Sequence, residues 1–142
     1  MSIPRSKLLN LKLRKMVVEK IEYPLIISEK GNINKIYRLS HDIFALKEVY
    51  TSEVLKDQFK AWKRHKFMTC SLVVIVGKVE FVIQNHDKSM STYILTEREN
   101  QKLIIPAGFW FGFRGLDDKN ILINCANVEH DENEIERKDI IV

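Results

Sequence analysis

The most apolar run of the chain is Leu72-Val73-Val74-Ile75-Val76-Gly77-Lys78-Val79-Glu80-Phe81-Val82-Ile83. β-Branched residues dominate it, which is typical of buried strands, and Gly77-Lys78 interrupts it where a tight turn would fall. The run therefore predicts two antiparallel strands joined by a hairpin. Shortly before it lies the polar octet Phe59-Lys60-Ala61-Trp62-Lys63-Arg64-His65-Lys66. On a strand that enters a β core, such an octet either faces solvent at an edge or lines a cavity, and the second alternative makes it a candidate site.

The rest of the chain shows the same pattern of short apolar segments separated by turn residues. Pro24 favours an edge position for the segment 21–27, and 51–58 fits a loop or one helical turn. The charged segment 129–139 has room for a helical turn, and 8–15 fits a strand better than a helical turn. The other predicted strands are 33–39, 43–50, 92–95, 121–125, and 103–105 and 109–113 on either side of a sharp Pro106-Ala107-Gly108 corner. Many short strands with little helix predict an all-β sandwich or barrel, in one domain over residues 1–142.

Composition bounds the class of protein. The 142 residues are 45% hydrophobic and 30% charged, which is ordinary for a globular protein. No apolar run reaches membrane-spanning length, and Lys12 and Arg14 break the first one, so we expect a cytoplasmic protein without a membrane partner. Cys70 and Cys125 both lie in apolar runs, which indicates buried, reduced thiols.

Charge is unevenly distributed along the chain. Residues 1–66 hold 15 lysines and arginines against 7 acidic residues, whereas residues 67–142 hold 8 against 12. A basic half can indicate nucleic-acid binding, but these cations are scattered through apolar segments and no nucleic-acid-binding motif accompanies them. The pattern favours a pocket for a smaller anion, and we expect no nucleic-acid partner.

Two stretches of the sequence resemble a known family. The spacing from Lys60 through His65 to Gly77, and the later Ile105-Pro106-Ala107-Gly108-Phe109-Trp110-Phe111-Gly112-Phe113, resemble the two motifs of cupins. More narrowly, the chain resembles dTDP-4-dehydrorhamnose 3,5-epimerases and the related dTDP-sugar 3,4-ketoisomerases. Ser28-Glu29-Lys30-Gly31 is similar to the family's early Asp-x-Arg-Gly turn. The resemblance covers residues from about 28 to 139.

This resemblance implies a cupin-type jelly roll, or double-stranded β-helix, that forms a homodimer. It also implies a nucleotide-sugar substrate, a nucleoside-diphosphate 4-keto-6-deoxysugar, which the protein would epimerise or isomerise without a metal or organic cofactor. The reaction would remove a proton beside the carbonyl, hold the resulting enolate and return the proton elsewhere.

The chain also departs from the family at positions that carry chemistry. Ketoisomerases resemble Arg-Gly-Phe-His-x-His over residues 60–65, where this chain keeps the second histidine as His65 and has Lys63 in place of the first. The epimerases take their base from the first position. Their tyrosine acid follows a Cys-Thr-Asp strand, where this chain has Val128 and Glu129. These departures leave open an alternative, a sugar-nucleotide-binding cupin that has lost catalysis.

A metal site is not expected. Metal-binding cupins use two histidines and a glutamate in the first motif and a histidine in the second. The matching positions here hold Lys63, His65, either Thr69 or Cys70, and Phe111. One suitable ligand out of four does not hold a transition metal.

The octet supplies the candidate catalytic residues. Strand alternation places Lys63, His65 and Phe67 on one face, with Arg64 and Lys66 on the other, unless a bulge intervenes. Inside a barrel, neutral His65 can act as a general base, and its alternative role is that of a structural histidine bonded to a carbonyl. Lys63 can stabilise an enolate oxygen if it points inward, or extend to the rim if it does not.

Five further residues are candidates for substrate binding. Lys60 and Lys30 fall where the family places phosphate-binding arginines, and Arg64 is a third candidate for holding the anion. Trp110 can stack on a base or sugar, although alternating aromatic residues more often form core or subunit interface. Glu129 lies in the region of the epimerase acid, and its alternative is a plain surface position.

Overall fold

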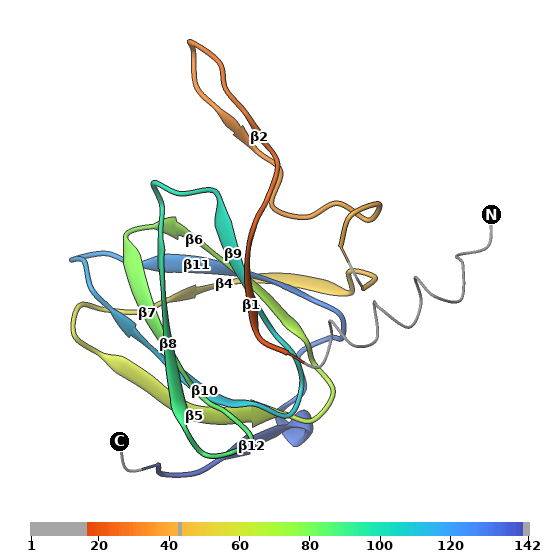
Figure 1. Ribbon diagram of the computed structural model, residues 1–142, viewed down its shortest axis with the longest axis vertical. Helices are drawn as coiled ribbons and strands as arrows, with labels where there is room; N and C mark the ends of the chain where they lie inside the picture. Colours follow the sequence, from red (N-terminus) through yellow and green to blue (C-terminus); the bar gives the residue numbers. More distant parts are fainter. Residues whose placement is uncertain (1–16, 43, 141–142) are drawn as a thin grey trace, which may run out of the picture.

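The structure is a computed structural model that describes residues 17–42 and 44–140. Two five-stranded antiparallel sheets face each other and enclose the core (Figure 1). In order across the first sheet, the strands are β1 (Glu19–Glu22), β9 (Gln101–Ile105), β6 (Cys70–Val76), β11 (Ile121–Ala126) and β4 (Glu48–Glu53). Across the second sheet they are β12 (Ile135–Arg137), β5 (Phe59–His65), β10 (Trp110–Gly115), β7 (Lys78–Gln84) and β8 (Met90–Thr96).

Two small elements lie outside these sheets. The strands β2 (Leu25–Ile26) and β3 (Ile33–Asn34) form a separate hairpin that projects away from the barrel (Figure 1). One short 3-10 helix, η1 (Glu132–Glu134), precedes β12, and the described residues contain no α-helix. None of the described segments forms a helix long and apolar enough to cross a bilayer.

Alternating side chains from both sheets fill the space between them. On β7, Val79, Phe81 and Ile83 are fully buried, while the residues between them are only partly buried. Leu103 and Ile105 meet them from the first sheet in the same hydrophobic cluster. This period of two is what a pleated sheet with one face on the core requires. The predicted all-β, cupin-type jelly roll is confirmed.

The predicted hairpin over residues 72–83 is wrong. β6 belongs to the first sheet and β7 to the second, so the chain changes sheets at Gly77 instead of folding back on itself. Gly77 has φ +84°, and a Cβ atom at this position would collide with the backbone oxygen of Lys119. The N–H of Lys78 is bonded to Asn120 Oδ1 at 3.0 Å. An isolated apolar run carries no information about which strand each half will pair with.

Some of the other predicted strands and turns are confirmed, and others are wrong or displaced. The strands predicted at 92–95, 103–105 and 121–125 are confirmed as parts of β8, β9 and β11, and η1 supplies the helical turn expected in 129–139. The strand predicted at 33–39 is wrong beyond Asn34, and that at 43–50 is displaced to β4. The segment 51–58 is the end of β4 followed by a loop. The strand expected at 8–15 lies outside the described residues.

The edge strand β4 of the first sheet contacts the segment that leads into η1 and β12, the edge strand of the second sheet. The N–H of His130 is bonded to Glu48 Oε2 of β4 at 2.7 Å. The His130 ring also packs edge-on against Tyr50 of β4, with ring centroids 6.0 Å apart. We call this edge between β4 and β12 the barrel mouth.

Candidate functional site

An irregularity in β5 sets the direction of its side chains. Phe111 of β10 is paired with Lys63, but Phe113 is paired with Lys60, so three residues of β5 advance against two of β10. A β-bulge of this kind changes the facing of the residues before it. Phe111 and Phe113 both belong to the hydrophobic core. Lys60 and Lys63 therefore share the inward side of the sheet despite being three residues apart.

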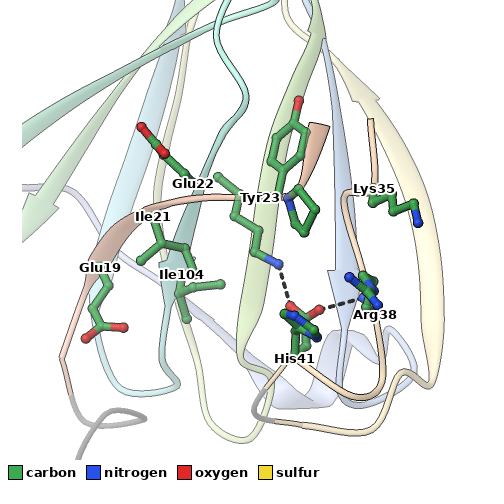
Figure 2. Close-up of a pocket in the computed structure, with 11 residues that line it drawn as sticks. Glu19, Ile21, Glu22, Tyr23, Lys35, Arg38, His41 and Ile104 are labelled. Carbon is green, nitrogen blue, oxygen red and sulfur yellow. Dashed lines mark hydrogen bonds and ion pairs between the residues drawn. The ribbon is translucent and has the colours of Figure 1, made fainter. Parts of the chain in front are cut away.

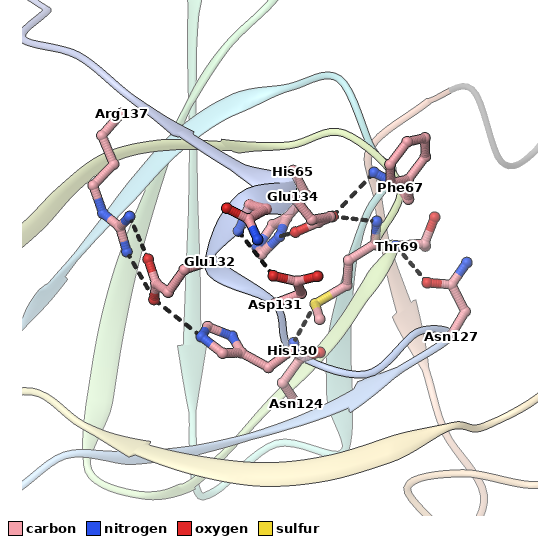
Figure 3. A network of polar contacts seen from close by, with 12 residues as sticks. His65, Phe67, Thr69, Asn124, Asn127, His130, Asp131, Glu132, Glu134 and Arg137 are labelled. Carbon is pink, nitrogen blue, oxygen red and sulfur yellow. Dashed lines mark hydrogen bonds and ion pairs between the residues drawn. The ribbon is translucent and has the colours of Figure 1, made fainter.

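His65 ends β5 inside the barrel and is only 2% exposed. Its Nδ1 atom lies 2.8 Å from Glu134 Oε2, in the polar network of Figure 3. Glu134 in turn accepts backbone N–H groups of Met68 at 2.6 Å and Phe67 at 3.0 Å on its other oxygen. Both carboxylate oxygens are thus occupied, and the acid is fixed in one orientation toward the imidazole.

The pair defines the tautomer of the histidine. An ionised carboxylate can only accept a hydrogen bond, so the Nδ1 atom of neutral His65 carries the proton and donates a hydrogen bond to Glu134. The opposite ring nitrogen, Nε2, is buried and has no hydrogen-bond partner among the described residues. An unpartnered buried acceptor is costly, and its free lone pair makes Nε2 the candidate proton acceptor of the ring.

Burial and hydrogen bonding act in opposite directions on this pair. Burial lowers the pKa of His65 below its usual value, and this effect outweighs the contact with Glu134, which raises it. For Glu134, burial would raise the pKa, but the hydrogen bonds from His65, Met68 and Phe67 outweigh it and hold the pKa below the ordinary value. At neutral pH the arrangement is therefore a neutral imidazole beside a carboxylate.

Lys63 points into the barrel interior. Its Nζ atom lies 5.5 Å from the ring centroid of Phe111 and 5.8 Å from that of Phe113. Together with Tyr50, Ser52 and other core residues it lines an interior cavity of about 30 Å³. Burial lowers the pKa of Lys63 below that of a solvated lysine. Of the two positions considered for this side chain, the structure has the inward one.

Sequence reasoning missed two polar side chains in this interior. The Tyr50 hydroxyl accepts a hydrogen bond from Asn124 Nδ2 at 2.8 Å and donates to Met68 Sδ at 3.7 Å. Burial raises the pKa of Tyr50 to about 12, so its hydroxyl keeps its proton at neutral pH. The only available signal was the alternation of β4, whose polar residues gave no indication of which face would be enclosed.

Glu134 was also missed, because it lies in a segment whose charges predict a solvated tail. Its Asp131–Glu134 turn bends the chain so that one carboxylate of this acidic segment enters the barrel. The following β12 then pairs with β5, with Ile135 opposite His65. The one sequence signal was Ile135, an apolar residue among charged neighbours.

The remaining predicted binding residues lie in different places. Lys60 is near the barrel mouth, where Nζ donates to the Glu53 carbonyl and to Ser52 Oγ at 3.3 Å. Arg64 faces the outside of the second sheet, paired with Glu136 Oε2 at 2.8 Å. Its guanidinium also stacks 4.7 Å from the ring centroid of Trp110. The structure thus brings Lys60 to the same side as Lys63, and places Arg64 and Trp110 on the opposite face.

Two candidates are remote from the interior. Lys30 is exposed in the turn of the β2–β3 hairpin, which projects from the barrel. Glu129 is exposed at a surface cavity of about 330 Å³, which Phe67 and Glu134 also line. The expectation that Phe67 would share the inward face with His65 is wrong, because β5 ends at His65 and Phe67 is 69% exposed.

The cysteines and the metal-type donors can be placed as well. Cys70 and Cys125 are buried free thiols, as expected. Burial raises the pKa of Cys70 to about 11, so it remains a thiol rather than the thiolate a metal prefers. Within residues 17–42 and 44–140, no three histidine, cysteine or acidic side chains are grouped closely enough to hold a metal ion. The donor set around His65 does not fit a cupin metal centre.

A second cavity lies outside the barrel, between the first sheet and the segment that precedes β4 (Figure 2). It encloses about 150 Å³ and contains a buried ion pair between Lys102 and Asp42. Asp42 also accepts the Arg38 N–H at 2.6 Å, and Lys102 donates to the Ile36 carbonyl at 3.2 Å. Since the two charges satisfy each other and the adjoining backbone, we assign the pair to holding this segment on β9.

Comparison with known proteins places the chain in a class. The model of the FdtA family, described as WxcM-like, C-terminal, matches residues 16–139. The chain belongs to this family. No curated protein sequence matches it.

Solved structures show the same fold. A dTDP sugar isomerase from Desulfovibrio desulfuricans G20 is 30% identical, with 86% of this chain and 83% of that chain covered and a TM-score of 0.77. A histidine-to-asparagine mutant of the 3,4-ketoisomerase from Thermoanaerobacterium thermosaccharolyticum, in complex with TDP-4-keto-6-deoxyglucose, is 22% identical over 85% and 87% of the two chains, with a TM-score of 0.74. The dTDP-4-dehydrorhamnose 3,5-epimerase from Bacillus anthracis, with TDP and PPi bound, is 17% identical over 87% and 79%, with a TM-score of 0.76.

Proposed function

We propose that this protein is an epimerase or isomerase of a dTDP-linked 4-keto-6-deoxysugar that works without a metal or an organic cofactor. The observation that carries the proposal is the buried His65, whose Nδ1 is bonded to Glu134 and whose Nε2 is free inside the barrel. The family and the 30%-identical dTDP sugar isomerase support the substrate class.

In the proposed reaction, His65 Nε2 removes a proton from the carbon next to the ketone. Its lowered pKa keeps the imidazole neutral and able to accept this proton. The Glu134 carboxylate then stabilises the imidazolium, as the acid of a catalytic triad does. Lys63 Nζ, which points into the interior, would stabilise the developing oxyanion, and the protonated Tyr50 hydroxyl is the candidate donor for returning a proton.

The size of the interior determines how the substrate would enter. A cavity of about 30 Å³ has no space for a whole sugar, so only the reacting edge of the ring would reach Lys63 from the barrel mouth. The diphosphate would stay outside, near Lys60. Because a lysine is a point charge without the fork of an arginine, this attraction would be strongly salt-dependent.

We also propose that the protein is a homodimer in the cytoplasm. The projecting hairpin that contains Lys30 supports the dimer. The hairpin carries exposed apolar side chains, with Ile27 81% and Ile33 55% exposed. A projecting apolar hairpin would be covered by a second copy, and Lys30 would then serve the partner's site instead of its own. Arg64, Trp110 and Glu129, which face away from the interior, would contact only the outer parts of a nucleotide.

The alternative is a cupin that binds a sugar nucleotide without turning it over. The observation that favours it is Lys63 in the position where the family has a histidine, since a lost base or acid typically costs about 10²–10⁴-fold in rate. The two functions differ in proton exchange. Incubating a panel of dTDP-4-ketosugars in D₂O should give deuterium beside the carbonyl if the protein is an isomerase, and none if it only binds.

A further inference from the structure

Lys63 is an amine without a counter-ion. It makes no hydrogen bond or salt bridge to another described residue, and its contacts are the rings of Phe111 and Phe113. Tyr50 and Ser52, which both carry hydroxyl groups, line the same interior cavity as Lys63. A lysine drawn toward a core normally pairs with an acid, and among the described residues no acid pairs with Lys63.

The surroundings of Lys63 lower its pKa and so increase the share of neutral amine. Burial lowers the pKa of Lys63, and the nearby cations Arg137 and Lys60 lower it further, while Cys70 and Glu132 act in the opposite direction. A desolvated lysine beside other cations is the arrangement that activates lysine as a nucleophile toward carbonyl compounds.

We propose that Lys63 forms an imine with the ketone of the bound substrate. This inference rests on the proposed function for the identity of the ketone. The Lys63 nitrogen attacks the carbonyl carbon, the oxygen takes a proton, and loss of one water leaves a protonated imine. His65 Nε2 removes a proton from the adjacent carbon, and its electron pair forms an enamine. Reprotonation and addition of one water return the ketone and the free amine, so no other reactant is consumed.

The positions of the two residues suit this sequence. Lys63 and His65 are two residues apart on β5, and both face the ring of Phe111, at 5.5 Å for Nζ and 6.1 Å between ring centroids. A carbonyl carbon bonded to Lys63 would therefore hold its neighbouring C–H bond near the Phe111 ring, against which the His65 imidazole also packs. The imine is a stronger electron sink than a ketone, which makes that proton easier to remove.

The imine also separates the two reactions left open above. Epimerisation beside the carbonyl is compatible with it, because hydrolysis of the imine restores the original ketone. Migration of the ketone to the next carbon is not, because the nitrogen would remain on the former carbonyl carbon as a secondary amine. The inference therefore assigns the chain to epimerisation rather than to ketone migration.

The test is reductive trapping. Wild-type protein is incubated with dTDP-4-keto-6-deoxyglucose and borohydride, and peptide mass spectrometry locates the adduct. We expect one sugar nucleotide attached to Lys63. The adduct should be absent from the Lys63→Met variant and present in the Lys78→Met variant, a control that removes an exposed lysine at the start of β7. The ligand-induced rise in Tm, measured on each variant without borohydride, reports folding and binding.

Failure of the imine and failure of the proposed function give different results. If the sugar nucleotide raises the Tm but no adduct forms on Lys63, the imine is wrong and the proposed function stands. If it does not raise the Tm, the proposed substrate is wrong. The nucleophilicity of the Lys63 amine is then measured by its rate of methylation with formaldehyde and cyanoborohydride at neutral pH. Lys63 should then react several-fold faster than Lys78, and an equal or slower rate overturns its nucleophilic role.

Discussion

His65 Nδ1 lies 2.8 Å from Glu134 Oε2, and both side chains are almost completely buried. The two residues are 69 positions apart in the chain, and the contact exists because β12 pairs with β5. The pairing fixes the ring, selects its tautomer and leaves Nε2 as the basic atom. The last strand of the fold is thus required for the position of the candidate base.

Glu134→Gln should therefore slow proton exchange while preserving the fold. The amide oxygen still accepts the Met68 and Phe67 N–H groups, but the negative charge beside His65 is lost. We expect a loss of roughly 100-fold in exchange rate, because a mispositioned group costs about that much. Glu134 raises the His65 pKa, so its removal should also move the acidic limb of the pH–rate profile to lower pH. An unchanged profile would show that the contact is only structural.

His65→Ala should abolish exchange of substrate protons but keep most of the Tm increase caused by the ligand. A base acts on the reaction barrier more than on ground-state binding. Deuterium incorporation by mass spectrometry measures the first effect and a thermal shift with dTDP the second. Full exchange by the variant would place the base elsewhere.

Lys60→Ala should do the reverse. It removes a cation near the barrel mouth, so dTDP binding should weaken and its salt dependence should decrease, with a smaller effect on exchange under saturating substrate. Titrations at low and at high ionic strength provide the measurement. Lys78→Ala, which removes an exposed lysine at the first position of β7, is the matched control and should bind like the wild type.

Chelators should leave both binding and exchange unaffected. Only His65 among the cupin ligand positions is a good metal donor, and its Nδ1 is already bonded to Glu134. Elemental analysis of the purified protein should find less than one equivalent of zinc, iron or manganese. One tightly bound equivalent that disappears in His65→Ala would contradict this prediction.

Asp42→Ala and Lys102→Met should each destabilise the protein by about 3–5 kcal/mol, because each leaves one buried charge unpaired. The double variant should lose much less than the sum of the two, since no unpaired charge remains. Chemical denaturation of all four proteins gives the coupling energy. Additive losses would mean that the two charges do not depend on each other.

The fold could be predicted from sequence to the extent that it depends on local pattern. The alternation in β7 and the short strands β8, β9 and β11 follow from local side-chain patterns. An apolar residue at every second position, or a short apolar run, is visible in the sequence alone. Sheet membership could not be predicted, because Gly77 permits both a hairpin and a corner. The corner is selected by Asn120, more than forty residues away, whose side chain binds the Lys78 N–H.

The site could be predicted only in part for the same reason. The octet led to His65 and Lys63, because its polar residues precede an apolar run. Glu134 reaches this interior from η1, just before the last strand, and Tyr50 reaches it from an edge strand, and neither residue's own type indicates burial. Strand alternation correctly placed Arg64 on the face opposite Lys63, and Trp110, a ligand candidate by sequence, lies on that outer face as well.

The bulge in β5 divides that strand into two parts that can change independently. The part that ends at His65 is fixed on both sides, by β10 and by β12. The part before the bulge contains Lys60 and has no such constraint from β12. Substitutions there can alter the charge near the barrel mouth while His65 keeps its place. The charge at the mouth and the position of the imidazole can therefore change separately, although both belong to one strand.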